Sequence, residues 1–207
     1  MAAPARTLEF YSSLTTLEQW AAVTLADPTG TGSVLQLGLT SYGALSGASN
    51  DITLPADADM VPLGEALWGD ILGSTPAHSP DSFAILNRNG ALFPIVGPAP
   101  AYPTNAPCWV AKGPGNAWYT GNSPGKAISV FFSDSQGGVF YKSVSLPGSP
   151  TDVTVSPDGK WLAVICTASG EGYVAVYSID AYGDLTHAAT SPSVGFPTTI
   201  SGVAISE

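Results

Sequence analysis

His78 is the side chain in this sequence best suited to moving a proton near neutral pH. It lies in the segment Ser74-Thr-Pro-Ala-His-Ser-Pro80, whose two prolines make it too irregular to be core. An imidazole titrates close to physiological pH, so His78 could act as a general acid or base. Glu171 and Asp152 are the carboxylates that could assist it. We treat these three as candidate catalytic residues; the alternative is that each is an ordinary solvated loop residue or turn cap.

Four further residues could hold a ligand beside them. Lys126 could pair with a carboxylate or polarise a carbonyl group. Asn105 and Asp59 lie near the expected starts of strands, and Trp109 would add an aromatic wall. The candidate substrate-binding residues are therefore Lys126, Trp109, Asn105 and Asp59.

No motif in the sequence indicates a metal or a cofactor. A phosphate-binding glycine loop and a metal-ligand triad are both missing. Cys108 and Cys166 do not form a Cys-x-x-Cys pair, so zinc has no support, and we expect two buried thiols.

An internal repeat of about 46 residues would position these side chains. Glycines at 43, 90, 137 and 183 are separated by 47, 47 and 46 residues, and tryptophans at 20, 68, 118 and 161 by 48, 50 and 43. Each copy is predicted to run from a Trp-led apolar strand through a gap and an alternating strand to a Gly-containing turn. Both spacings together indicate one unit repeated four times.

Each unit is predicted to contain four antiparallel strands. In the last copy these are 152–156, 161–166, 173–179 and 185–190, with a turn at Ser156-Pro-Asp-Gly159. Period-2 apolar positions and a period in the forties are typical of β-propeller blades. We therefore predict an all-β, single-domain propeller with blades at about 7–54, 58–100, 106–147 and 151–190 and a closing strand at 199–206. A β-sandwich is the alternative.

A propeller would bring the candidate residues to one face. Loops between the second and third strands share that face with the blade-to-blade connections, around the central channel. The repeat assigns four such loops to it, at 26–32, 73–81, 121–126 and 167–172. They contain His78, Lys126 and Glu171, whereas Asp59, Asn105 and Asp152 come from the connections.

The net charge of the chain limits the kinds of molecule that we expect it to bind. Sixteen acidic against six basic residues give a net charge of −10, which repels nucleic acids and anionic membranes. No apolar stretch reaches the 18 or so residues of a spanning helix. No signal peptide is visible, so we expect a cytoplasmic location, although a mature secreted chain would look the same.

Two segments resemble a known family. Thr151-Asp-Val-Thr-Val-Ser-Pro-Asp-Gly-Lys-Trp-Leu-Ala-Val164 resembles the blade signature of lactonase-type seven-bladed propellers, the group of 6-phosphogluconolactonase and carboxymuconate cyclase. Asn105-Ala-Pro-Cys-Trp-Val110, followed by Ala117-Trp-Tyr-Thr120, is similar to a later stretch of that family. The resemblance covers about residues 30–207, which would correspond to the C-terminal part of a family member.

The resemblance implies a function. We expect hydrolysis or cyclisation of a small cyclic or lactone-type metabolite, bound without a cofactor. The alternative is a non-catalytic propeller that binds a ligand or a protein. Enzymes acting on polycarboxylates would present several basic groups, and the chain has only two arginines, Arg6 and Arg88. This shortage argues against a carboxymuconate-type activity.

Four blades in place of seven raise the question of how the ring closes. If each open blade face carried roughly 500 Å² of apolar surface, wetting both would forfeit on the order of 25 kcal/mol. That exceeds the usual net stability of a domain. We therefore expect a tight four-bladed ring, a homodimer that completes a ring, or dependence on blades outside this sequence, and we favour dimerisation or another partner.

Overall fold

The structure is a computed structural model that describes residues 5–12, 19–25, 33–53, 62–68, 71–76, 81–88, 91–100, 107–123, 125–134, 137–192 and 202–206. These residues form four antiparallel sheets of four strands each, and neighbours in the sequence are neighbours in the sheet. The all-β prediction is confirmed.

The sheets follow one another along the chain, and we number them 1 to 4. Sheet 1 contains β1 (Ala5–Ser12), β2 (Gln19–Leu25), β3 (Ser33–Leu39) and β4 (Leu45–Thr53). Sheet 2 contains β5 (Pro62–Trp68), β6 (Ile71–Pro76), β7 (Asp81–Arg88) and β8 (Ala91–Pro100). Sheet 3 contains β9 (Pro107–Lys112), β10 (Ala117–Asn122), β11 (Ala127–Asp134) and β12 (Gly137–Ser145). Sheet 4 contains β13 (Ser149–Val155), β14 (Trp161–Ala168), β15 (Glu171–Ile179) and β16 (Leu185–Thr190).

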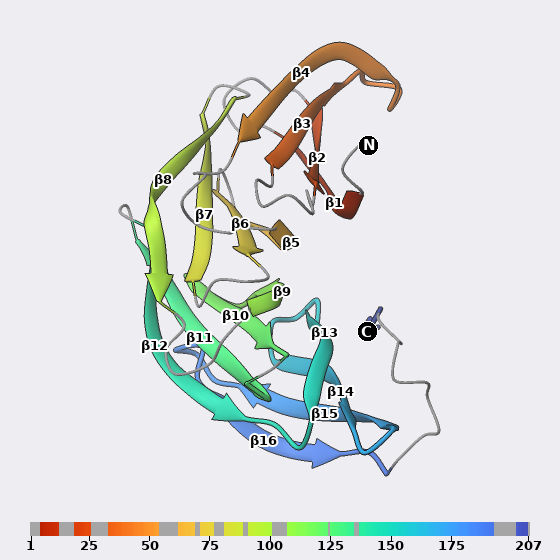
Figure 1. The fold of residues 1–207 in the computed structure, drawn as a ribbon, viewed down its shortest axis with the longest axis vertical. Helices are drawn as coiled ribbons and strands as arrows, with labels where there is room; N and C mark the ends of the chain where they lie inside the picture. The colour runs from red at the N-terminus through yellow and green to blue at the C-terminus, as the bar shows by residue number, and fades with distance from the viewer. Residues whose placement is uncertain are drawn as a thin grey trace.

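The four sheets are arranged as an arc. The first strands of successive sheets contact one another, β1 with β5, β5 with β9 and β9 with β13. Figure 1 shows these strands on the concave side, and sheets 1 and 4 at the two ends of the arc. This is the radial arrangement of propeller blades, so the sandwich alternative is wrong.

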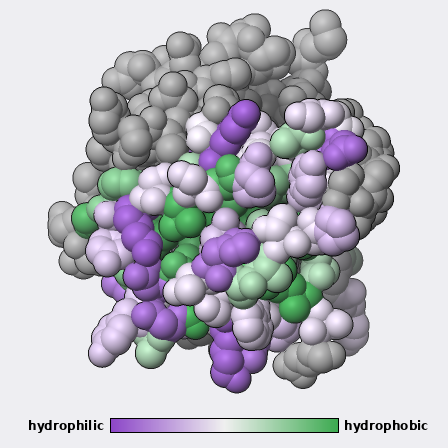
Figure 2. Space-filling model, turned by 90° about the horizontal axis from the view of Figure 1, so that it is seen from below, coloured by the Kyte–Doolittle hydropathy of each residue, from purple (hydrophilic) through white to green (hydrophobic). Residues whose placement is uncertain are grey.

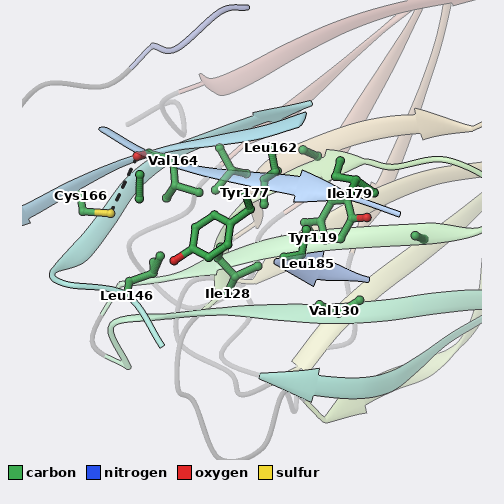
Figure 3. Packing of buried hydrophobic residues seen from close by; sticks show 14 residues of the cluster. Tyr119, Ile128, Val130, Leu146, Leu162, Val164, Cys166, Tyr177, Ile179 and Leu185 are labelled. Carbon is green, nitrogen blue, oxygen red and sulfur yellow. Dashed lines mark hydrogen bonds between the residues drawn. The ribbon is translucent and has the colours of Figure 1, made fainter. Parts of the chain in front are cut away.

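The core between sheets 3 and 4 shows how one blade stacks on the next. Ile128 and Val130 of sheet 3 meet Leu162 and Val164 of sheet 4 in one cluster, all fully buried (Figure 3). Side chains along a strand point alternately to the two faces, so Trp118 and Phe131 form a separate cluster on the opposite face of sheet 3. Sheet 3 is therefore buried on both faces, as an internal blade must be.

The predicted turn at Ser156–Gly159 forms as its residue types require. The Ser156 carbonyl accepts the Gly159 N–H at 2.8 Å, and the Ser156 hydroxyl donates to Asp158 Oδ1 at 2.6 Å. Asp158 Oδ1 also accepts the Lys160 N–H at 3.1 Å. These bonds lower the pKa of Asp158 to about 2, and Gly159 has φ +71°. The turn fixes the register of β13 and β14.

The tryptophan spacing is a poorer guide than the glycine spacing. Trp68 was expected to open a second strand, but it ends the first strand of sheet 2, opposite Ile71. Trp20 and Trp161 occupy equivalent positions. Each pairs with the residue that lies two positions before the first residue of the next turn, which is the β3–β4 turn for Trp20 and the β15–β16 turn for Trp161. Trp118 is one residue out of step with them and therefore lies on the opposite face. The prediction of one shared position is wrong for Trp68 and Trp118.

The glycine turns of sheets 1 and 4 are alike, whereas Gly90 lies outside the described residues and Gly137 opens strand β12. In sheet 1 the Thr40 carbonyl accepts the Gly43 N–H at 2.9 Å, and in sheet 4 the Asp180 carbonyl accepts the Gly183 N–H at 3.0 Å. Both glycines have a positive φ, of +76° and +82°. Both turns begin with a side chain that accepts backbone N–H groups, Thr40 Oγ1 and Asp180 Oδ1. In these two sheets a capping side chain and a glycine with a positive φ therefore fix the conformation of the turn.

The predicted closing strand at 199–206 does not form in its described part. Residues 202–206 belong to no sheet, and Gly202 has φ +101°, outside the strand region. In each sheet the first strand pairs only with the second strand of the same sheet.

Candidate functional site

Four connections gather at one end of sheets 3 and 4. The Leu146 N–H donates to the Lys126 carbonyl at 2.8 Å, which joins the β12–β13 connection to the β10–β11 loop. The backbone at Gly148 lies against Thr167 of β14 so closely that a Cβ would collide with the Thr167 carbonyl. The Ser191 N–H donates to the Val174 carbonyl at 2.8 Å. This end is the face to which the sequence assigned the candidate residues.

Lys126 and Glu171 both lie on this face with exposed side chains. Lys126 sits in the β10–β11 loop with φ +46°. Glu171 begins β15, where its Oε2 accepts the Tyr173 hydroxyl at 3.0 Å and thereby raises the pKa of Tyr173. Neither residue is among the two ion pairs found within the described part of the chain. Both can contact a ligand above the loops, but they form no acid–base pair with each other.

Both carboxylate oxygens of Asp152 accept hydrogen bonds from backbone N–H groups. Its Oδ1 accepts the N–H of Val153 at 2.8 Å, and its Oδ2 accepts those of Gly202 and Val203 at 2.8 and 2.9 Å. Asp152 lies opposite Ile165, on the face of sheet 4 that points away from sheet 3. The carboxylate therefore ties residues 202–206 to β13.

We expect Asp152→Asn to release the C-terminal segment. The amide loses the charge and directs a donor toward N–H groups, so we expect a loss of about 1–3 kcal/mol of stability. Hydrogen exchange at the amides of Gly202 and Val203 should rise at least tenfold. Glu171→Gln, at an exposed carboxylate of the same sheet, is the control and should leave that exchange unchanged. Equal exchange in both variants would contradict the assignment.

Trp109 also contributes to the packing between two sheets. It lies on β9, half-buried, and packs against the core cluster between sheets 3 and 4. Trp109 and Asp152 each stand two residues after a proline, Pro107 or Pro150, and both point toward the next blade position. The proline spacing is a sequence signal that could have indicated this inter-blade role for both residues.

The remaining candidates cannot be placed. His78, Asp59 and Asn105 lie outside the described residues. Lys126 and Glu171 lie at this end of the sheets, whereas Asp152 lies within β13, opposite Ile165.

The two cysteines are inert thiols. Both are buried and neither forms a disulfide bond, and burial raises the pKa of each to about 11. At neutral pH they are protonated and therefore poor nucleophiles. No group of three or more metal-ligating side chains occurs among the described residues.

Lys112 is a titratable group that the sequence did not single out. Burial lowers its pKa to about 8. Its ammonium donates to the carbonyls of Gly113 and Gly115, the latter at 2.8 Å, and lies 5.5 Å from the centre of the Trp118 ring. Lys112 thus closes the β9–β10 turn, at the opposite end of sheet 3 from the candidate face. The turn sequence Lys-Gly-Pro-Gly was the available signal.

No helix in the described part of the chain is long and apolar enough to cross a membrane. No family model matches the sequence, and no curated protein matches it.

Solved structures do match. A functionally unknown protein from Desulfotomaculum acetoxidans superimposes with a TM-score of 0.71 at 15% identity, over 92% of this chain and 58% of its own. A "putative 6-phosphogluconolactonase" from Bacteroides uniformis gives 0.68 at 16% identity, over 84% and 55%. A protein of the same description from Bacteroides fragilis gives 0.60 at 15% identity, over 89% and 67%. Hydrazine synthase from Kuenenia stuttgartiensis gives 0.58 at 18% identity, over 80% and 44%.

At sequence identities of 15–18%, these matches show similarity of fold alone. The chain spans between 44% and 67% of the length of these four solved chains. Hydrazine synthase is among them, so the arc of sheets serves more than one chemistry. The chain therefore has the fold of part of a lactonase-type β-propeller.

Proposed function

We propose that this protein is a lactonase-like propeller that acts on a small cyclic or lactone-type metabolite, by hydrolysis or cyclisation. The observation that carries the proposal is the likeness to two structures described as 6-phosphogluconolactonases over 84% and 89% of this chain. The convergence of the loop that holds Lys126, the β14–β15 hairpin that holds Glu171 and the β12–β13 connection at one end supports a ligand face there.

The proposed substrate carries little negative charge. Six basic against sixteen acidic residues give a field that repels polyanions such as phosphorylated sugars. On the described part of the ligand face Lys126 is exposed and Glu171 balances it. A neutral lactone, such as an unphosphorylated aldonolactone, fits these charges better than a sugar phosphate.

His78 is the proposed general base. An imidazole can take a proton from the water that attacks the lactone carbonyl and return it to the leaving alkoxide. Lys126 is proposed to stabilise the oxyanion.

We expect His78→Ala to reduce turnover of glucono-δ-lactone at least tenfold, measured by indicator-coupled acid release with spontaneous hydrolysis subtracted. The chain offers a matched control, because it has two histidines. His187 lies on the outer strand β16, where Nε2 lies 2.8 Å from Thr190 Oγ1, and His187→Ala should leave the rate unchanged. Full activity of His78→Ala, or no turnover of any neutral lactone by the wild type, would contradict the proposal.

A non-catalytic scaffold is the second candidate. It is favoured by Asp152, whose two carboxylate oxygens accept three backbone N–H groups and hold chain segments together. Under this alternative, lactones would bind without turnover, or would not bind.

A further inference from the structure

Sheet 1 carries an apolar face that points out of the arc. Leu35 and Leu37 lie on it, half-buried, together with Leu39, which pairs with Leu45 across the sheet. Leu45 is 65% exposed. The opposite face holds the buried side chains of Trp20 and Gln36, on the side of sheet 2, whose strand β5 contacts β1 and β2. The leucine face therefore lies at the open end.

The same positions are buried in sheet 4. The turns that start at Thr40 and Asp180 are equivalent. A residue at a given distance from Thr40 in sheet 1 therefore has its counterpart at the same distance from Asp180 in sheet 4. The counterparts of Leu35, Leu37, Leu39 and Leu45 are Ala175, Tyr177, Ile179 and Leu185. All four counterparts belong to the core between sheets 3 and 4, and Leu185 is only 7% exposed. In sheet 4 a neighbouring blade covers this surface.

The contact in sheet 4 shows what kind of partner covers such a face. Gly183 sits so close to β10 that a Cβ added to it would lie 2.6 Å from the Ala117 Cβ. The Tyr119 hydroxyl donates to the Gly183 carbonyl at 2.8 Å, and Lys142 of sheet 3 forms an ion pair with Asp184. At the equivalent Gly43, nothing lies within 4 Å. The turn in sheet 1 thus lacks the blade that its counterpart rests on.

The other end of the arc presents the complementary surface. The face of sheet 4 that points away from sheet 3 carries Trp161, Val174 and Val176, with Trp161 at 42% exposure. Figure 2, a view from the sheet 4 end, shows hydrophobic residues reaching the surface between hydrophilic ones. By strand pairing Trp161 takes the place that Ala117 has in sheet 3, under the docked turn. A turn like that of sheet 1 would there meet the indole of Trp161 in place of the Ala117 methyl group.

We propose that a second copy of this chain covers both faces. Sheet 4 of each copy would stack on sheet 1 of the other, so that two arcs related by a two-fold axis close into one ring. Trp161 would lie under the turn of the partner's sheet 1 at each junction, whereas Tyr42, 97% exposed, would stay at the surface as its counterpart Tyr182, 83% exposed, does. The charged residues on the described strands of the two faces are Asp51, which pairs with Leu35, and Asp152, which is already bonded to three N–H groups.

The blade count is compatible with closure. Two copies give a ring of eight sheets, within the range of about 4–8 blades known for propellers. Going from seven to eight blades lowers the angle between neighbours from about 51° to about 45°, a change spread over every junction. Residues 202–206, held at Asp152, would lie inside the ring next to the first strand of the partner's sheet 1.

Light scattering on the purified chain tests the proposal. The wild type should have twice the 21.1 kDa mass of one chain. Leu45→Asp places a charge in the junction and should give the mass of a single chain with an unchanged circular dichroism spectrum. Val139→Asp is the control, because Val139 is 57% exposed on β12 of the internal sheet 3, and it should keep the doubled mass. A monomeric wild type, or equal masses for both variants, would overturn the proposal.

Mixing variants tests the direction of the contact. Trp161→Asp should also be monomeric, because it disables the sheet 4 face. A mixture of Leu45→Asp with Trp161→Asp retains one intact junction, the sheet 4 face of the first against the sheet 1 face of the second. It should therefore form heterodimers, weaker than the wild-type dimer. A Trp161→Asp protein that dimerises by itself would show a contact between two sheet 1 faces and overturn the head-to-tail ring.

Discussion

Gly183→Ala should destabilise the protein by about 2–5 kcal/mol. The left-handed conformation at φ +82° costs a residue with a side chain about 1–2 kcal/mol. The new methyl group would also lie 2.6 Å from the Ala117 Cβ and 3.4 Å from the Phe132 ring, and such overpacking costs about 1–3 kcal/mol. Urea unfolding followed by fluorescence gives the difference in free energy directly.

Gly43→Ala is the matched control. Gly43 occupies the same place in the same turn with φ +76°, but nothing lies within 4 Å of it. Its substitution should show the conformational cost alone, about 1–2 kcal/mol. The comparison is made in the Trp161→Asp background, which keeps the sheet 1 face open. Equal losses at both glycines would show that the sheet 4 turn does not dock on sheet 3.

Leu185→Ala should cost about 2–5 kcal/mol, the range for truncating a buried leucine. Leu185 is 7% exposed, opens β16 and packs in the cluster between sheets 3 and 4. Its removal leaves a cavity beside the Tyr119–Gly183 hydrogen bond, which spans the same two sheets. Thermal unfolding by calorimetry is a suitable measurement, because the loss should appear as a lower Tm.

Leu45→Ala is the counterpart in sheet 1. The residue type and its place after the turn are the same, but Leu45 is 65% exposed. In the Trp161→Asp background we expect a change within about 0.5 kcal/mol, as for other surface substitutions. A large loss at Leu45 in that background would contradict the open end of the arc.

The fold was predictable because its local signals agree. Alternating valines predicted β13 to β15 in sheet 4, and the Ser-Pro-Asp-Gly turn fixed where β13 ends. The glycine spacing marked the turns at Gly43 and Gly183, where a positive φ is required. The tryptophan spacing gave a wrong prediction of the repeat positions, because an indole side chain can be buried equally well on either face of a strand. Trp68 and Trp118 accordingly belong to other repeat positions.

For the candidate site, only the end of the sheets at which Lys126 and Glu171 lie was predictable. Strand order alone brings Lys126 and Glu171 to one end, since those loops join equivalent strands. What a carboxylate does there depends on which N–H groups approach it, and Gly202 and Val203 reach Asp152 from 50 and 51 residues away. Such a contact has no local pattern. The burial of Trp109 depends in the same way on a neighbouring sheet.

The stacking of sheet 4 on sheet 3 as propeller blades is tested most directly by a double-mutant cycle between Gly183→Ala and Ala117→Gly. Removing the Ala117 methyl group makes room for the new one at position 183, because the two Cβ atoms would otherwise lie 2.6 Å apart. We expect a favourable coupling free energy of about 1–3 kcal/mol in urea unfolding, typical of residues in contact. Strictly additive losses would mean that the turn and β10 do not touch, and would contradict the arrangement of the blades.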